Sequence, residues 1–288
     1  MNKLKIDLGC GSRKKEGTIG IDMQAEPGVD YVLNLQADPL PFPDQSVEYI
    51  HSAHFLEHLE NGNYVVKIFK EISRVCVDGA ELELWGPYSW SNSAFVLGHN
   101  LFFNEDHYLH LGFWYSEIWE KDLKAQWLLK EITYIIEPEV LVELYKNKIS
   151  LDFALKYYKG VVKEFGVLIE VRHDYKGEKL QPIRTFAVER SAKRYPLKWE
   201  SEVGWNSSEL ENALDWFSLL QLQSAINASL TPPQPQPTQV EKQIQLQLHH
   251  TQVELQQSQA MINAMQTSKF WKLRTAWFKF KKLVGLPT

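Results

Sequence analysis

Two glycines directly after a short apolar run constrain the fold of this chain more than any other feature. The run Leu4–Leu8 has the length and composition of a buried strand, and it leads into Gly9-Cys10-Gly11. Glycine has no Cβ, so backbone amides at such a turn can approach a ligand closely. A second run, Ile19–Asp22, ends in an acid that can accept hydrogen bonds from ribose hydroxyls. These features predict a nucleoside site on an α/β sheet.

The hydrophobic pattern beyond the turn predicts a Rossmann-like, doubly wound and mostly parallel sheet. We expect a helix to begin at the glycine turn, where its N-terminal dipole would favour a ligand. A further helix is predicted over Tyr64–Val75, which has apolar residues at helical spacing, and Asp78-Gly79 should end it. Alternate prolines exclude a helix from Pro39–Asp44. Additional strands are expected at 31–35, 47–51 and 80–85.

The remaining chain divides into an insertion, a closing hairpin and a C-terminal extension. The main domain is expected over 1–190, with a helical insertion at about 87–165. Segments 166–173 and 184–190 look like antiparallel closing strands, and 128–136 competes with them for a place in the sheet. We expect a helical extension at 191–230 with a helix over 208–229, a proline-rich linker at 231–238, and a Gln-rich helix with a basic tail at 239–288.

Four ordered motifs within residues 4–85 resemble the type 11 group of the class I S-adenosylmethionine-dependent methyltransferases. The first is the Asp7–Gly11 turn. The others are Gly17–Asp22, Pro39–Glu48 and Ser52–Leu59, in the order and spacing of that group. A Gly-x-Gly turn also occurs in nicotinamide dinucleotide enzymes, but those favour a third glycine where this chain has the bulky, basic Arg13 and Lys14. The resemblance implies S-adenosylmethionine as the cofactor.

The resemblance also implies a role for individual residues. Asp7, Gly9 and Gly11 would line the methionine moiety, with Cys10 on the turn between them. Asp22 would bind the ribose hydroxyls and Met23 would pack against adenine. The remaining cofactor residues would be Asn34 and Leu35 beside the adenine amino group and Ser52 near the sulfonium. Asn34 departs from the family, which usually has an acid there, and Cys76–Gly79 stands where the family commonly has a Leu-Lys-Pro-Gly turn.

Histidines supply the candidate bases for a hydroxyl acceptor. His54 would face the sulfonium and the acceptor, and His107 follows the fifth predicted strand, where an open α/β sheet places its ligand crevice. A role for either in loop or helix hydrogen bonding is the structural alternative. The set His99, Asp106, His107 and His110 offers nitrogen and oxygen ligands, but its spacing fits no metal motif, so we expect no metal.

Composition and charge narrow the cellular setting. The chain has 288 residues, two cysteines and a net charge of −5. Residues 239–288 carry seven Lys or Arg and two Glu, a net +5, so residues 1–238 carry −10. An acidic body disfavours nucleic acid as a partner. The scarce cysteines, the absence of a long apolar run and the strand-like start predict a cytoplasmic protein.

The C-terminal segment has two distinct patterns. Residues 239–267 form an imperfect heptad, which fits weak self-association through a coiled coil as well as an unpaired helix. Residues 268–288 combine six Lys or Arg with Trp and Phe at helical spacing and contain no acid. This profile is typical of a helix lying on an anionic membrane. Docking on a partner protein and contact with RNA are the alternatives.

Taken together, the sequence predicts a methyltransferase that is peripheral at the inner membrane face. The basic tail and the many aromatic residues within 85–115 favour O-methylation of a sugar, a lipid-linked glycan or another small-molecule acceptor in surface-polysaccharide assembly. The tail resembles short tails of bacterial enzymes in that process. The alternative is a non-catalytic, cofactor-binding scaffold that recruits partners through its C-terminal helices, an interpretation that Asn34 and the altered turn at Cys76 leave open.

Overall fold

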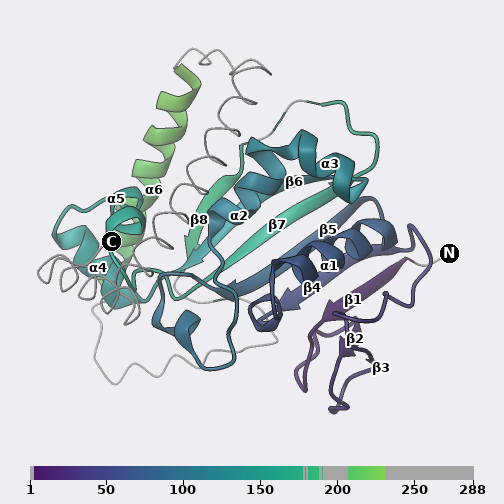
Figure 1. The fold of residues 1–288 in the computed structure, drawn as a ribbon. Coiled ribbons are helices and arrows are strands. Elements are labelled where there is room, and N and C mark those ends of the chain that lie inside the picture. The colour runs from purple at the N-terminus through teal and green to yellow at the C-terminus, as the bar shows by residue number, and fades with distance from the viewer. Residues whose placement is uncertain (1–2, 178, 180, 188–189, 191–206, 231–288) are drawn as a thin grey trace, which may run out of the picture. The chain divides into compact units, whose positions relative to one another are not determined.

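The computed structural model describes residues 3–177, 179, 181–187, 190 and 207–230 (Figure 1). Within these residues, eight strands form one sheet in the order β3-β2-β1-β4-β5-β7-β6-β8. The strands are β1 (Leu4–Leu8), β2 (Ile19–Asp22), β3 (Tyr31–Val32), β4 (Val47–Ala53), β5 (Cys76–Pro87), β6 (Gln126–Ile135), β7 (Glu164–Arg172) and β8 (Ile183–Ala187). The strands predicted at 4–8, 19–22, 47–51 and 80–85 are confirmed as β1, β2, β4 and β5, and β5 extends beyond the predicted strand at both ends.

The sheet is mixed. Parallel pairing joins β3, β2, β1, β4 and β5, whereas β7 is antiparallel to both β5 and β6. The Rossmann-like class with an antiparallel closing strand is thus confirmed. The predicted hairpin of 166–173 with 184–190 is wrong, because β8 pairs in parallel with β6. Trp127, Leu129 and Ile132 of β6 are buried, so this strand gains more from the place beside β7 than the half-exposed β8 would.

Three helices lie together on one face of the sheet. Figure 1 shows α1 (Gly62–Val75), α2 (Glu105–Leu109) and α3 (Ser116–Leu123) on the same face. The predicted helix over Tyr64–Val75 is confirmed as α1, which packs through Phe69 on Trp127 of β6 with 4.6 Å between ring centroids. The other helical elements are η1 (Leu56–His58), η2 (Asn92–Phe95), the π-turn η3 (His110–Trp114), α4 (Pro138–Lys146), α5 (Leu151–Tyr157) and α6 (Ser207–Leu230).

The helix expected at the glycine turn is absent. The ten residues between Leu8 and Ile19 form turns instead. A helical crossover between parallel strands usually needs a dozen or more residues, so this connection is too short. Side-chain bonds replace the helix, since Lys14 Nζ donates to Asp30 Oδ2 over 2.7 Å and Lys15 N donates to Asp7 Oδ2 over 2.8 Å.

The predicted turn at Cys76–Gly79 is also wrong. Helix α1 ends at Val75, and β5 begins at the next residue. The register with β4 then shifts, so that Val47 faces Cys76 whereas Tyr49 faces Glu81. Gly79 lies within this irregular stretch and has a φ of +81°. Glycine is therefore favoured at this position even though no loop separates α1 from β5.

The segment expected to be a helical insertion contains a strand of the main sheet. Its helical elements lie within 92–123 and 138–157, and β6 lies between them. Helix α6 confirms the helix predicted at 208–229. The proline-rich linker, the Gln-rich helix and the basic tail lie outside the described residues. In the part that is described, no helix has both the length and the apolar character needed to cross a bilayer.

Candidate active site

The glycine turn lies at the carboxyl end of β1 and is held by β2. Gly9 and Cys10 donate from their backbone amides to the Ile21 carbonyl over 2.9 and 3.2 Å. Gly9 has a φ of +65°, and a Cβ there would lie 2.6 Å from the Phe55 side chain. Gly11 has a φ of +48°, and open space surrounds the position of its missing Cβ. Gly9 therefore permits close packing against Phe55, and at Gly11 no neighbour fills the space that a side chain would take.

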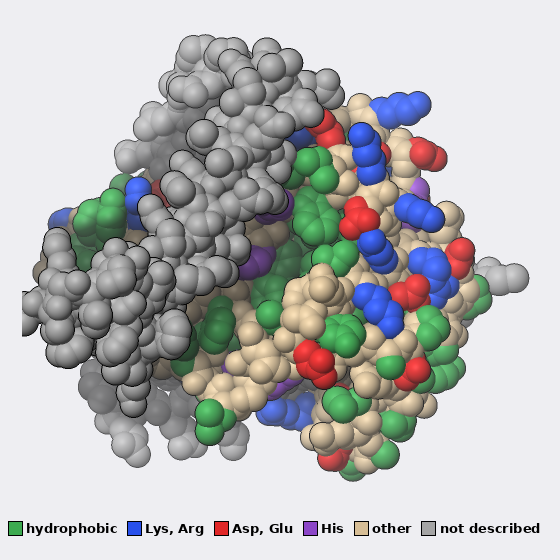
Figure 2. Space-filling view, viewed as in Figure 1, with side chains coloured by type: hydrophobic (Ala, Val, Ile, Leu, Met, Phe, Trp, Pro, Cys, Tyr) green, Lys and Arg blue, Asp and Glu red, His purple; other side chains and the backbone are tan. Residues whose placement is uncertain are grey.

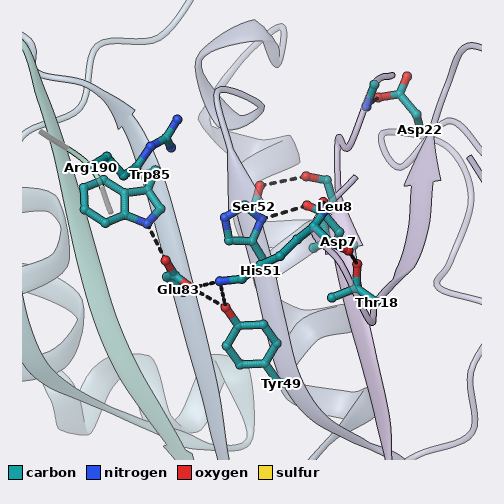
Figure 3. A network of polar contacts seen from close by, with 12 residues as sticks. Asp7, Leu8, Thr18, Asp22, Tyr49, His51, Ser52, Glu83, Trp85 and Arg190 are labelled. Carbon is teal, nitrogen blue, oxygen red and sulfur yellow. Dashed lines mark hydrogen bonds and ion pairs between the residues drawn. The ribbon is translucent and has the colours of Figure 1, made fainter. Parts of the chain in front are cut away.

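Beneath this turn, Asp7 lies in the sheet with both of its oxygens engaged. Asp7 Oδ1 and His51 Nδ1 are 2.9 Å apart, and both side chains are fully buried. Asp7 Oδ2 accepts from the Lys15 amide. A buried carboxylate with such partners resists displacement, so Asp7 fixes the loop that follows the turn. Figure 3 shows this pair beside the hydrogen bond from Ser52 Oγ to the Leu8 carbonyl, which is 3.0 Å long.

Asp22 meets the turn from the carboxyl end of β2. Its Oδ2 accepts from the Gly11 amide over 2.8 Å, and its Oδ1 accepts from the Gln24 amide over 3.0 Å. The side chain of the next residue, Met23, is 61% exposed. Asp22, Met23 and the turn therefore come together as the sequence predicts, with an exposed apolar side chain beside an acid.

The remaining predicted cofactor residues differ in their surroundings. Ser52 is buried behind the turn, and Leu35 belongs to the hydrophobic core. Asn34 is exposed, and its Oδ1 accepts from the Gln36 amide over 3.0 Å. Leu35 and Ser52 thus support the site from behind, while Asn34 stabilises a local turn.

His54 forms the centre of a charged cluster at the same edge of the sheet. It has a φ of +54°, and its Nδ1 and Nε2 lie 3.1 Å from Glu57 Oε1 and 3.0 Å from Glu164 Oε1. Burial alone would lower the pKa of His54, but the bonds to Glu164 and Glu57 outweigh it and raise the pKa to about 9. Arg190 also pairs with Glu164, over 2.9 Å. With a carboxylate at each ring nitrogen, His54 does not fit the general base expected from the sequence.

His107 bonds within its own helix. Its Nδ1 lies 2.8 Å from Asn104 Oδ1, and the two residues form the capping box of α2. Its ring packs 5.3 Å from that of Phe103, and burial lowers the pKa of His107. These contacts match the structural alternative to its predicted catalytic role.

A comparison with protein families identifies the kind of domain to which this edge of the sheet belongs. Residues 15–83 match the model of a family described as a methyltransferase domain. The matched stretch includes Asp22, β4 and most of β5, and the sheet has the mixed Rossmann-like order described above. Residues 15–83 therefore match a methyltransferase domain, which agrees with the predicted class I S-adenosylmethionine-dependent methyltransferase. The chain is an enzyme, and S-adenosylmethionine is its cofactor.

Solved methyltransferases resemble parts of this one at low similarity. An enzyme described as a SAM dependent methyltransferase from Archaeoglobus fulgidus is 14% identical, over 58% of this chain and 86% of that one, with a TM-score of 0.43. A SAM-dependent methyltransferase from Methanosarcina mazei is also 14% identical, over 60% of this chain and 95% of that one, with a TM-score of 0.37. Phosphoethanolamine N-methyltransferase 2 of Haemonchus contortus, in complex with S-adenosyl-L-methionine, is 14% identical, over 60% of this chain and 50% of that one, with a TM-score of 0.34. Such values assign no acceptor. A comparison with curated proteins finds no match.

The open backbone beside Gly11 fits the methyltransferase cofactor. The space that a side chain at Gly11 would take is open, and Gly11 bonds to the carboxylate of Asp22, which precedes the exposed Met23. An acid of this kind accepts from ribose hydroxyls, and an apolar side chain can cover a base. Gly11, Asp22 and Met23 would therefore hold the nucleoside, while Asp7 and Ser52 keep the turn in shape.

Sequence reasoning missed a second polar network that adjoins the methyltransferase site. Figure 3 shows Glu83 of β5 accepting from Tyr49 and Trp85, and the Lys15 ammonium is a third donor to the same carboxylate. Burial would raise the pKa of Glu83, but these three donors outweigh it and hold the pKa at about 2. The alternation of polar residues along β4 and β5 was the available signal, because period-two side chains share a face. Glu164 and Arg190 gave no comparable signal, since they lie far away in sequence.

Proposed function

We propose that this methyltransferase O-methylates a sugar or lipid-linked glycan, or a related small molecule, during assembly of surface polysaccharide. The proposed reaction joins the methyl carbon to an acceptor hydroxyl oxygen. The bond from that carbon to the sulfonium sulfur breaks, and the sulfur keeps the electron pair. The hydroxyl proton leaves to a base or to water. The products are a methyl ether and S-adenosylhomocysteine.

An uncharged, exposed segment beside the site carries this proposal. From Leu84 to Asn104 the chain has 21 residues without Lys, Arg, Asp or Glu. The segment begins in the last four residues of β5 and continues past the carboxyl end of this strand, and parallel strands place their ligands at that edge. It exposes five large apolar side chains, with Leu97 99% exposed and Phe95 57% exposed. They are Trp90, Phe95, Val96, Leu97 and Phe102.

Exposed aromatic rings on an uncharged loop suit a sugar face or a lipid chain. Rings contact the C–H faces of sugars and also rest well at a membrane interface. Phe95 and Phe102 pack against each other at 5.1 Å, and Lys159 Nζ lies 4.8 Å from the Phe95 ring centre. In Figure 2, hydrophobic and His side chains gather toward the middle of the view, whereas charges of both signs are spread over the right-hand part. An apolar surface with a neighbouring cation favours a lipid-linked phosphate acceptor.

The side chains at the edge would mainly position the acceptor. When bound, S-adenosylmethionine supplies an electrophilic methyl group on a sulfonium. Glu164 is held by His54 and Arg190, so its carboxylate has a fixed direction. A fixed carboxylate can accept from an acceptor hydroxyl and align its oxygen, and alignment is the largest requirement of an in-line displacement. His54 thus acts as a positioning residue in this proposal.

The cellular setting is also part of the proposal. We place the enzyme in the cytoplasm, peripheral at the inner face of the membrane, with the basic tail 268–288 on anionic lipid. One amphipathic helix gives reversible contact, and a second apolar element strengthens it. The exposed segment 90–102 supplies such an element. Weak self-association through 239–267 remains a proposal that light scattering can test.

The acceptor is tested with radiolabelled methyl donor and a cell-envelope extract. The extract is separated into a lipid-linked glycan fraction, a soluble sugar fraction and protein. We expect label in the glycan fraction that survives mild alkali, because ethers resist alkali whereas carboxyl methyl esters are hydrolysed. Label confined to protein, or label that alkali removes, contradicts the proposed acceptor.

The matched control for this assay is Asp22→Ala. Loss of the ribose acceptor should weaken cofactor binding by about 100-fold, which corresponds to about 2.7 kcal/mol. Calorimetry with S-adenosylhomocysteine measures the loss, and circular dichroism checks the fold. If the variant labels the same fraction as strongly as the natural enzyme, the label does not come from this site.

Membrane contact is tested by sedimentation with vesicles. We expect the full chain to bind vesicles containing anionic lipid, and a chain lacking 268–288 to be released while it still binds S-adenosylhomocysteine. High salt should weaken binding, since screening reduces the attraction of lysines to lipid phosphates. Equal retention of the shortened chain refutes anchoring by the tail.

A further inference from the structure

Three side chains with metal-ligating atoms come together next to the candidate active site. They are Glu57 and His58 of η1 and His99 of the loop that follows β5. One ligand atom from each lies within 4.8 Å of the others. Glu57 is buried, His99 is half-buried and His58 is exposed. No other group of three such residues is found in the described part of the chain.

We propose that Glu57, His58 and His99 bind a divalent first-row transition-metal cation. Two imidazoles and one carboxylate form a donor set that zinc, iron, cobalt and nickel accept. The remaining coordination positions would stay open to water or to another oxygen ligand. This site is independent of the acceptor proposed above and would stand if that acceptor were wrong.

The hydrogen bonds of His58 orient it as a ligand. His58 Nδ1 lies 3.1 Å from the Gly98 carbonyl oxygen, so Nδ1 carries the proton and donates. The lone pair is then on Nε2. Metal-ligating histidines almost always donate their other ring N–H in this way, because the bond fixes both tautomer and ring direction.

His99 differs from His58 in the surroundings of its Nδ1 atom. Its Nδ1 is buried and has no hydrogen-bond partner among the described residues. A buried nitrogen without a partner is costly in a purely structural role, since its hydration is lost without replacement. A cation between His99, His58 and Glu57 would satisfy this atom. The rings of His58 and His99 lie edge to face with centroids 4.7 Å apart, so the two imidazoles are close enough to share one cation.

Backbone bonds hold the loop against η1. The Asn100 and Leu101 amides donate to the Glu57 carbonyl over 2.8 and 3.1 Å, and Asn100 Nδ2 donates to the His58 carbonyl over 3.3 Å. Gly98, with a φ of +97°, makes the turn before His99. Ligand atoms of one tetrahedral zinc ion are about 3.4 Å apart, so the cluster needs to contract by roughly 1 Å. Side-chain rotation of the exposed His58 and the half-buried His99 can supply this.

The carboxylate of Glu57 lies between this cluster and the methyl-transfer edge. Its Oε1 contacts His54, and its Oε2 is the atom nearest to the open side of Gly86, 3.7 Å from where a Cβ would be. A cation bound through Glu57 would therefore lie beside the edge that receives the acceptor. The pairing of His99 with Glu57 and His58 differs from the set weighed in the sequence, in which His99 was grouped with Asp106, His107 and His110.

The test is calorimetric titration of untagged, chelator-treated full-length enzyme with Zn²⁺, with Mg²⁺ as a comparison, followed by the visible spectrum of the Co²⁺ form. We expect Zn²⁺ to bind much more tightly than Mg²⁺, and Co²⁺ to give the intense absorption of a site with fewer than six ligands. His58→Asn keeps a donor near the Gly98 carbonyl but removes Nε2. It should weaken the tightest Zn²⁺ binding by at least about 10-fold, as should His99→Asn.

His110→Asn is the matched control, because His110 bonds to Trp119 outside the cluster. It should leave the tight site unchanged. The proposal is overturned if His58→Asn, His99→Asn and His110→Asn bind Zn²⁺ alike, which would indicate adventitious binding at surface histidines. It is also overturned if the natural chain prefers neither ion or if Co²⁺ gives only the weak spectrum of six oxygen ligands. Thermal unfolding of each variant shows whether it folds, and Glu57→Gln provides a second, isosteric variant.

Discussion

The two faces of strands β4 and β5 differ in the polarity of their side chains. Toward α1, the strands present Ile50, Leu82 and Leu84, all nearly or fully buried. On the other face, His51 pairs with Asp7, and Glu83 accepts from Lys15, Tyr49 and Trp85. One face excludes water with helices and apolar side chains. On the other face, Lys15 reaches from the ten-residue loop between β1 and β2 and bonds to Tyr49 and Glu83.

This difference shows what a short connection requires of a parallel sheet. Apolar burial stabilises without strict geometry, at about 25 cal/mol for each Å² removed from water. A loop has too little apolar surface for this, so the face beneath it needs specific polar partners. Such partners fix one position for the loop, and the glycine turn belongs to the same loop. The polar face therefore positions the cofactor site, while the apolar face supplies most of the stability.

The largest expected effect is on the apolar face. Trp127 is 2% exposed, packs on Phe69 and donates from Nε1 to Ser73 Oγ over 2.9 Å. Trp127→Ala should lower the free energy of unfolding by about 3–5 kcal/mol, because it removes a large buried side chain and leaves a cavity. Urea unfolding followed by circular dichroism measures the loss. Changing the salt concentration should barely alter it.

Trp90→Ala is the matched control, since Trp90 is 55% exposed. We expect a change within about 0.5 kcal/mol. Equal losses for the two tryptophans would mean that α1 and β6 do not carry the stability assigned to them here.

Elements with a strong local pattern were predictable from the sequence. Five apolar residues at helical spacing gave α1, and the runs at Leu4–Leu8 and Ile19–Asp22 gave β1 and β2 with their observed bounds. The acid Asp22 beside Gly11 was predictable for the same reason, because parallel strands bring their carboxyl ends to one edge. These features depend on neighbours within a few residues or on a rule of topology.

Features that depend on distant partners were not predictable. The pairing of β8 with β6 was wrong because several apolar segments competed for one place, and only the whole sheet decides between them. The helix predicted at the glycine turn was wrong because only ten residues separate β1 from β2, too few for a helical crossover. His54 was expected to be a base, yet Glu164, 110 residues away, occupies its Nε2. Its ionisation is therefore set by a residue that no local pattern identifies.

A smaller effect is expected on the polar face, from Lys15→Met. Methionine keeps most of the apolar stem but removes the ammonium that bonds to Glu83 and Tyr49. The Lys15 and Glu83 side chains are 29% and 23% exposed, so water partly compensates. We expect a loss of about 1–2 kcal/mol at neutral pH, together with weaker cofactor binding as the loop loosens. Urea unfolding and calorimetry measure the two quantities.

The sign of the pH dependence follows from Glu83. Its pKa is held at about 2, below the ordinary 4.5, by donors from the loop, β4 and β5. A lowered carboxyl pKa stabilises the folded chain above the ordinary pKa and loses that effect as the pH falls toward the folded value. The difference between the natural chain and Lys15→Met should thus be complete above about pH 5 and shrink toward pH 3. A difference that stays constant over this range would show that Glu83 does not depend on Lys15.

The smallest expected effect comes from the same substitution one residue earlier. Lys14 pairs with Asp30 over 2.7 Å at the surface, where the two side chains are 25% and 44% exposed. Asp30 also accepts from the Gly20 amide, so it keeps a partner in Lys14→Met. We expect a loss below about 1 kcal/mol that vanishes in high salt, whereas the Lys15→Met loss should largely persist. Both variants remove one positive charge from the same loop. Urea unfolding of the pair at two salt concentrations therefore separates the effect of the position of the lysine from the effect of losing a charge. If they lose equal stability and respond equally to salt, the polar face of the sheet does not hold the loop, and its fixed position at the glycine turn needs another cause.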